Sequence, residues 1–110
     1  MALVRTASLL CFAALAIAGG QGFRTADQLK DHYEKYGAAF GHISRDQYLH
    51  LAQQLRDSHV GNFILESKRP DGTIRFDKRH GYFGSYDPDG TIRTFFIPTD
   101  GVRYFERVSR

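Results

Sequence analysis

The segment RPDGTIRFD at residues 69–77 returns as DPDGTIRTF at residues 87–95, and the residues Pro-Asp-Gly-Thr-Ile-Arg are identical in the two copies. Proline at the first central position of a turn presets φ, and glycine takes the left-handed residue that ends a three-residue hairpin loop. Each copy therefore predicts a hairpin turn followed by the start of the returning strand. A solenoid needs three or more stacked repeats, so two copies indicate that one turn is used twice.

The residues around both copies have the period of a β-strand. Beyond Gly61 apolar and polar side chains alternate, and aromatic and β-branched residues gather in the runs 63–66, 73–77, 82–83 and 92–97. Turn signals separate these runs, at 70–72, 78–81 and 88–90. This part of the chain is predicted to form a four-stranded antiparallel meander.

Two amphipathic helices are predicted before the strands. Thr25 with Gln28, and Ser44 with Gln47, have the spacing of a capping box. Gly37 is expected to end the first helix in a left-handed conformation. Apolar side chains then recur at helical spacing on one face of each segment: Leu29, Tyr33 and Tyr36 in the first, and Tyr48, Leu51, Ala52 and Leu55 in the second.

Helices followed by strands predict the α+β class, with two N-terminal helices packed on one face of the four-stranded antiparallel meander. Residues 25–110 are expected to form this single domain, after a short linker at 19–24. The predicted core consists of Tyr33, Tyr48, Leu51, Leu55, Ile74 and Phe83.

The first eighteen residues have the pattern of a secretory signal peptide. A basic segment ends at Arg5, an uncharged apolar run follows, and Ala16 and Ala18 place small residues at a cleavage site after residue 18. The alternative is a membrane anchor, but the run of roughly a dozen residues is shorter than the ~20 that span a bilayer. The mature protein is therefore expected to be secreted or periplasmic, without stable membrane insertion.

Charge and cysteine content constrain the mature chain further. Cys11 lies in the apolar run, so no disulfide is expected after cleavage. Loss of Arg5 lowers the formal net charge from +3 to +2, which is compatible with a polyanionic partner. The sequence has no Gly-rich phosphate loop, no H-E-x-x-H and no cysteine pair; of its five histidines, His42 and His50 could share a metal only if folding brings them together. No metal or cofactor is expected.

Two arginines follow the repeated turn at equivalent positions. Arg75 and Arg93 lie on strands that run in the same direction, and two strand spacings would separate them by about 10 Å if they share a face. Guanidinium groups at that separation can bind one phosphate or two neighbouring phosphates. The alternative is that both arginines are solvated on the outer face.

Metal-free cleavage of an RNA phosphodiester needs a general base for the 2′-hydroxyl, cations for the charge that develops on phosphorus, and an acid for the leaving oxygen. His32 with Arg75, Arg93 and Thr94 supplies these residue types, and Lys35 and Tyr36 lie beside His32 in the sequence. Each has a structural alternative: Tyr36 can pack in the core, and His32 can hydrogen-bond within its helix.

Four segments together resemble the C-terminal ribonuclease toxin domains of bacterial polymorphic toxins, of the barnase/EndoU/colicin/RelE-like group. They are DHYEKYGAAFG at 31–41, DQYLHLAQ at 46–53, RPDGTIRFD at 69–77 and GYFGSYDPDGTIRTFFIP at 81–98. The family pattern is similar to H-x-x-x-H-G-x-E-F-G on the first helix, followed by a strand pair with a D/N-G turn and by I-R-T-x-F-x-P. The resemblance covers about 70 residues in the same order.

The resemblance implies a metal-independent endoribonuclease whose substrate is RNA, with tRNA as a candidate, in a monomer that an immunity protein could inhibit. It places the family histidine at His32, the strand arginine at Arg75, and the Arg-Thr pair at Arg93 and Thr94. Substrate contacts are assigned to Lys35, Tyr36 and Lys68.

Two departures from the family pattern bear on activity. The second histidine of the helix motif is Tyr36 here, and the acidic residue before Phe40 is Ala39. Tyrosine, with an unperturbed pKa near 10, suits an acid better than a base at neutral pH. The rival hypothesis is a non-catalytic secreted binding module, or a degenerate toxin domain, that uses its aromatic sheet to bind a partner.

Overall fold

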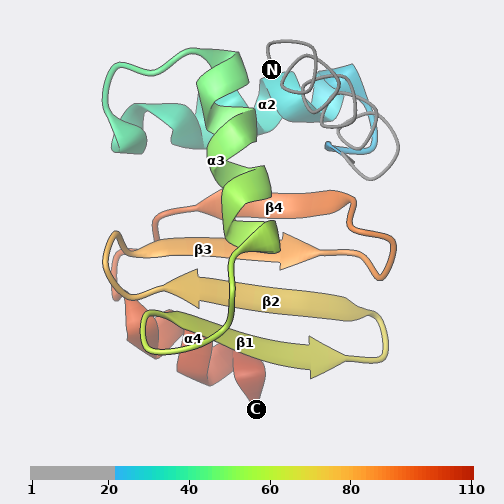
Figure 1. Ribbon diagram of the computed structural model, residues 1–110. Coiled ribbons are helices and arrows are strands. Elements are labelled where there is room, and N and C mark those ends of the chain that lie inside the picture. Colours follow the sequence, from blue (N-terminus) through green and yellow to red (C-terminus); the bar gives the residue numbers. More distant parts are fainter. Residues whose placement is uncertain (1–21) are drawn as a thin grey trace, which may run out of the picture.

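The computed structural model describes residues 22–110, which form an α+β fold (Figure 1). The predicted signal peptide and residues 19–21 of the predicted linker lie outside this range. The elements follow one another as α2 (Ala26–Tyr36), the 3₁₀ helix η1 (Gly37–Phe40), α3 (Arg45–Asp57), β1 (Ile64–Arg69), β2 (Gly72–Asp77), β3 (Tyr82–Tyr86), β4 (Ile92–Phe96) and α4 (Val102–Ser109).

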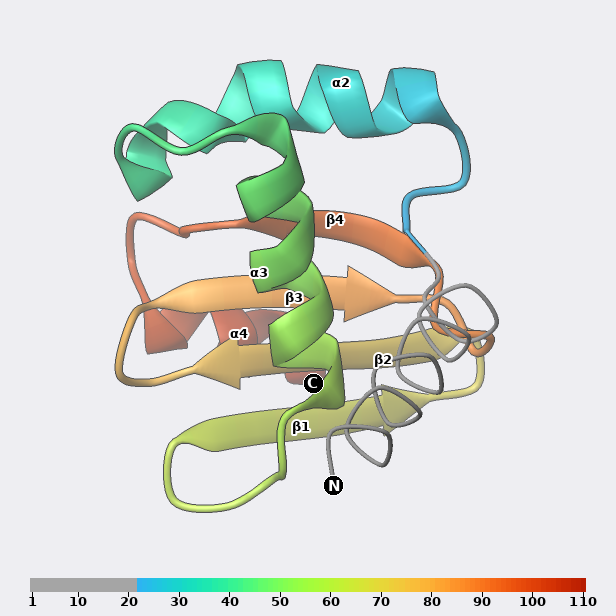
Figure 2. The same cartoon turned by 45° about the horizontal axis from the view of Figure 1, so that its top comes forward.

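The four strands form one antiparallel sheet in the order β1-β2-β3-β4, which confirms the predicted meander. The helices are arranged differently from the prediction. Helix α3 crosses one face of the sheet, α4 covers the opposite face, and α2 runs along the β4 edge above α3 (Figures 1 and 2). The expected two-helix layer therefore missed α4, and it placed α2 over the sheet rather than at its edge.

Each face of the sheet has its own core. Beneath α3, Tyr86, Ile92 and Phe95 from the strands pack against Tyr48, Ala52 and Leu55. Beneath α4, Ile74, Phe76 and Phe83 pack against Phe105. Of the six predicted core residues, four are buried as expected, and Tyr33 and Leu51 are half-buried.

The helix starts agree with the capping predictions, but the first helix ends differently. The Thr25 hydroxyl accepts the backbone N–H of Gln28 at 3.1 Å, and Ser44 and Gln47 form a complete capping box. Gly37 has φ −61° and continues into η1, so it is not left-handed. Its lack of a side chain serves packing instead, because a Cβ there would lie 2.7 Å from Cδ1 of the Tyr33 ring.

The two copies of the repeated hexamer form different hairpins. Arg69 pairs with Gly72, so the first hairpin has a two-residue loop, whereas Tyr86 pairs with Ile92 across the longer loop 87–91. Ser85 pairs with Thr94 and Tyr86 with Ile92, which leaves Arg93 as the extra residue of a β-bulge. The three-residue loop predicted for both copies occurs in neither.

The bulge changes the face on which the second copy is buried. Ile74 in the first copy lies in the core beneath α4, whereas the equivalent Ile92 lies in the core beneath α3. A shift of one residue in register moves a side chain to the other face of a sheet. Identical residues in the two copies therefore have different neighbours.

Candidate functional site

A pocket of about 280 Å³ lies between the start of α2 and the β3–β4 hairpin. Its polar lining brings together two predicted site residues, His32 and Arg93, with Arg24 and Asp87, which the sequence analysis had not singled out. Gln28, Thr91 and Ile92 complete the lining. The pocket is small, and its charged lining consists of two arginines, one aspartate and the ionisable His32.

His32 is held against the β4 edge by the way in which the chain enters α2. The Gly22 carbonyl accepts the backbone N–H of Ile92 at 2.8 Å, and Phe23 forms a parallel bridge to the same residue. The His32 ring then packs on Phe23, with 4.8 Å between ring centroids. Helix α2 therefore starts beside Ile92 and follows β4.

One hydrogen bond defines the tautomer of His32. Its Nδ1 lies 3.0 Å from the Gln28 carbonyl oxygen, which can only accept a hydrogen bond, so Nδ1 carries the proton. In the neutral imidazole, Nε2 is then the basic nitrogen. The neutral tautomer of His32 can therefore accept a proton at Nε2.

Asp87 holds two guanidinium groups at the pocket. Its Oδ1 accepts a hydrogen bond from Nε of Arg93 at 2.8 Å and lies 2.7 Å from Nη2 of the same side chain, and its Oδ2 forms an ion pair with Arg24. Arg93 Nη2 also donates to the Asp71 carbonyl in the β1–β2 turn. The Asp87 side chain is 17% exposed, against 62% for Arg24 and 44% for Arg93, so both guanidinium groups remain accessible to an anion.

Thr94 and Tyr36 are placed by the common direction of α2 and β4. The Tyr36 ring stacks on Phe96 at 5.2 Å between centroids. His32 precedes Tyr36 by one helical turn, about 6 Å, and Thr94 precedes Phe96 by two strand residues, about 6.6 Å. Helix α2 and strand β4 therefore run side by side over this length, but Thr94 is not part of the lining of the pocket that contains His32.

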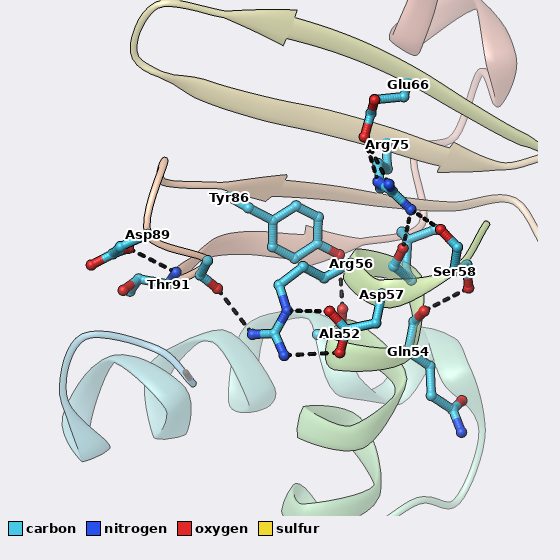
Figure 3. Close-up of polar contacts among 12 residues, drawn as sticks. Ala52, Gln54, Arg56, Asp57, Ser58, Glu66, Arg75, Tyr86, Asp89 and Thr91 are labelled. Carbon is cyan, nitrogen blue, oxygen red and sulfur yellow. Dashed lines mark hydrogen bonds and ion pairs between the residues drawn. The ribbon is translucent and has the colours of Figure 1, made fainter. Parts of the chain in front are cut away.

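Arg75 has a different environment from Arg93. It lies beneath α3, where its guanidinium pairs with Glu66 (Nη2 to Oε2, 2.7 Å) and donates to the carbonyl oxygens of Leu55, at 3.1 Å, and Ser58 (Figure 3). The side chain is 12% exposed. Arg75 thus binds the C-terminal end of α3 and the partly buried carboxylate of Glu66.

The strand register also corrects the predicted height of the two arginines. Arg75 pairs with Gly84, and Gly84 pairs with Phe95, so Arg75 is level with a residue two positions beyond Arg93. The arginines share no partner and do not form the expected pair. Arg56 reaches from α3 to the second turn, where it donates to the Gly90 carbonyl at 3.0 Å (Figure 3).

The two lysines assigned to substrate binding lie outside the pocket lining. Lys35 is exposed on α2, with its Nζ 5.3 Å from the centroid of the Tyr36 ring. Lys68 is exposed on β1, which β2 and β3 separate from β4 by about 14 Å in all. The structure therefore places Lys35 beside Tyr36, and Lys68 on the far strand of the sheet.

The sequence contained one sign of the missed carboxylate. The two hexamer copies differ at the preceding residue, which is Arg69 in the first and Asp87 in the second. Asp87 supplies the charge that holds Arg93 after the second turn, whereas Arg69 pairs across the first hairpin with Gly72. Arg24 directly precedes the capping residue Thr25, and no sequence pattern marks Arg24 as a residue of the pocket.

Within residues 22–110, no group of three or more His, Cys, Asp or Glu side chains is arranged to hold a metal ion. No helix among these residues is long and apolar enough to cross a membrane. The chain matches no protein-family model, and a search of curated proteins gives no match. Its function is therefore inferred from the pocket and from the sequence pattern.

Proposed function

We propose that the protein is a metal-independent endoribonuclease and that the α2–β4 pocket is its active site. The observation that carries this proposal is that His32, with Nε2 as its basic nitrogen, lines the same pocket as Arg93 and Arg24. A base beside two guanidinium groups supplies two of the three components of such cleavage, the general base and the cations, and water is proposed as the acid for the leaving oxygen.

The proposed step is an internal displacement at phosphorus. His32 Nε2 takes the proton of the 2′-hydroxyl, the 2′-oxygen forms a bond to phosphorus, and the bond from phosphorus to the 5′-oxygen breaks. The leaving 5′-oxygen takes a proton from water, and the hydroxide that remains takes the proton held by His32, which restores the base. The products are a 2′,3′-cyclic phosphate and a free 5′-hydroxyl. No redox change or co-reactant is needed.

Arg93 and Arg24 have the charge to stabilise the non-bridging phosphate oxygens in this step. Asp87 pairs with both groups, and the Asp71 carboxylate lies 3.7 Å from Arg93 Nη1. These two carboxylates hold the guanidinium groups in place before the substrate arrives, and we propose that the phosphate competes with them for the exposed guanidinium N–H groups. Thr94, which follows Arg93 on β4, is proposed to donate its hydroxyl to a phosphate oxygen. Arg75 is assigned to the structure of the domain rather than to the phosphate.

The test is cleavage of total tRNA and a short single-stranded RNA by the purified mature protein in EDTA. We expect products that end in a 2′,3′-cyclic phosphate, and no cleavage where the 2′-hydroxyl is replaced by hydrogen. His32→Ala and Arg93→Ala should each lower the rate by about 10²–10³-fold, the usual cost of losing one such group. His50→Ala, an exposed histidine on α3, is the matched control and should cleave like wild type.

The second candidate is a non-catalytic binding module, which the departures at Tyr36 and Ala39 favour. The Tyr36 ring packs on Phe96 and the Ala39 side chain offers no acid, so neither replaces the groups of the family pattern. A wild-type protein that binds RNA but leaves it intact, with or without added divalent metal, would establish the module and exclude the nuclease.

A further inference from the structure

A second surface with the chemistry of a nucleic-acid contact lies at the other end of the sheet. Among residues 22–110, the exposed large apolar side chains are Val60, at 54% exposure, and Phe63, at 45%. Both belong to the α3–β1 loop, which adjoins the β2–β3 turn because Lys78 donates its backbone N–H to the Phe63 carbonyl at 2.8 Å. We call this surface, made of Val60, Phe63, Lys78, Arg79 and His80, the Phe63 patch.

The planar groups of the Phe63 patch are already stacked. The guanidinium carbon of Arg79 lies 4.1 Å from the centroid of the Phe63 ring. The His80 ring stacks on Tyr82 at 5.1 Å and remains 57% exposed. The exposed rings of Phe63 and His80 offer π-faces to an incoming planar ligand, and Arg79 adds a cationic group beside Phe63.

The charge of the patch is positive at its surface. Lys78 and Arg79 are exposed, while the nearby Asp77 carboxylate is 14% exposed and accepts the backbone N–H of Arg79 at 2.8 Å and Nδ1 of His80 at 2.7 Å. The one carboxylate in the turn is therefore directed into the turn itself. Among residues 22–110, no ion pair joins Lys78 or Arg79 to an acidic side chain.

We infer that the Phe63 patch binds single-stranded RNA, with a base stacked on Phe63 and phosphates bound by Lys78 and Arg79. This inference rests on the proposed function for the identity of the polymer. Strand β3 connects the patch to the pocket at its other end over about 17 Å, a path that a strand of several nucleotides spans (Figures 1 and 2). The patch would thus hold RNA beyond the scissile phosphate.

The composition of the patch favours RNA over an anionic membrane. Membrane-surface segments present a broad apolar face, whereas here two apolar side chains stand beside stacked, cationic, planar groups. Stacking on aromatic side chains beside basic residues is the usual way in which single-stranded nucleic acid is bound without a defined sequence.

The experiment measures binding of a fluorescein-labelled twelve-nucleotide RNA whose riboses are all 2′-O-methylated, so that cleavage cannot occur. Fluorescence anisotropy gives the Kd for wild type, Phe63→Ala, Arg79→Gln and Arg45→Gln. Arg45 is the matched control, because it loses the same charge at the exposed first turn of α3, about 20 Å along the helix from the loop. Circular dichroism confirms that each variant is folded.

We expect Phe63→Ala and Arg79→Gln each to weaken binding by about tenfold, and Arg45→Gln by less than twofold. A Phe63→Ala variant that binds the RNA like wild type would overturn the inference, as would equal losses for Arg79→Gln and Arg45→Gln. Loss of binding to phosphatidylserine vesicles in Phe63→Ala, with RNA binding intact, would assign the patch to a membrane instead.

The outcomes separate this inference from the proposed function. If wild type binds the methylated RNA through Phe63 but never cleaves unmodified RNA, the nuclease fails and the RNA surface stands. If the protein cleaves RNA while Phe63→Ala leaves the KM for a twelve-nucleotide substrate unchanged, the nuclease stands and the Phe63 patch fails.

Discussion

Replacement of Arg75 by methionine tests whether this arginine supports the fold or the chemistry. Methionine keeps an unbranched apolar stem in place of the arginine stem and removes the guanidinium. The change leaves the Glu66 carboxylate, 17% exposed, without its partner, and it removes the donors to Leu55 and Ser58 at the end of α3. Both effects act on the folded state rather than on the pocket.

The expected loss of stability can be estimated from these contacts. Removal of one member of a buried ion pair costs about 3–5 kcal/mol. Because 12% of Arg75 and 17% of Glu66 remain exposed, water relieves part of this cost, and we expect about 2–4 kcal/mol in the free energy of unfolding. A domain of this size has about 5–13 kcal/mol in all, so the variant should still fold.

Urea unfolding followed by circular dichroism measures this loss, and RNA cleavage by the folded variant measures activity. Glu66→Gln in the Arg75→Met background removes the unpaired charge and should restore about 1–2 kcal/mol. Per folded molecule, cleavage should stay within about threefold of wild type. A variant with normal stability and a loss of activity of about 10²-fold or more would refute the structural role and return Arg75 to the phosphate site.

Four further predictions follow from single features. Gly72→Ala should lose at least about 2 kcal/mol of stability, because position 72 has φ +150° and a Cβ there would lie 2.2 Å from the Tyr86 carbonyl oxygen. Gly61 has open space around it, so Gly61→Ala should lose less than half as much, and equal losses in urea unfolding would contradict this. Burial raises the pKa values of the Tyr86 and Tyr48 hydroxyls above the ordinary 10.0, so the unfolded chain releases these protons first. The two tyrosines therefore add no pH dependence below about pH 9, and stability should fall as the pH rises above about 10; urea midpoints that stay level to about pH 11.5 would disprove it. N-terminal sequencing of the secreted protein should begin at Gly19, and retention of Met1 would rule out the signal peptide. Tyr36→His, which restores the family residue, should raise the cleavage rate and shift its pH profile toward neutrality, and an unchanged profile would show that position 36 serves packing alone.

Local signals in the sequence predicted α2, α3 and the four strands, but not α4. The capping box of Ser44 and Gln47 and the apolar stripe of α3 are interactions within one helix, so they can be read without knowledge of the rest of the chain. The alternation of apolar and polar residues along each strand is also a local signal. Helix α4 was missed because it has eight residues and no side-chain cap at Gly101, and a helix that short is stabilised mainly by burying Phe105 on the sheet.

The candidate site was predicted in part for the same reason. His32 and Arg93 were singled out from residue type and pattern, and the structure brings them into one pocket. Their companions Arg24 and Asp87 are 63 residues apart in sequence, and only the parallel contact of Phe23 with Ile92 brings them together.

The sequence alone determined the class of the fold and the residues whose side-chain chemistry suits a functional site, since both depend on local composition and spacing. What only the tertiary structure decided was the environment of each copy of the repeat. The loop after Tyr86 is longer than the one after Arg69, and the bulge at Arg93 shifts the register by one residue. Because successive strand residues face opposite sides of a sheet, that shift sends the same arginine of the hexamer to α3 in one copy and to the pocket in the other.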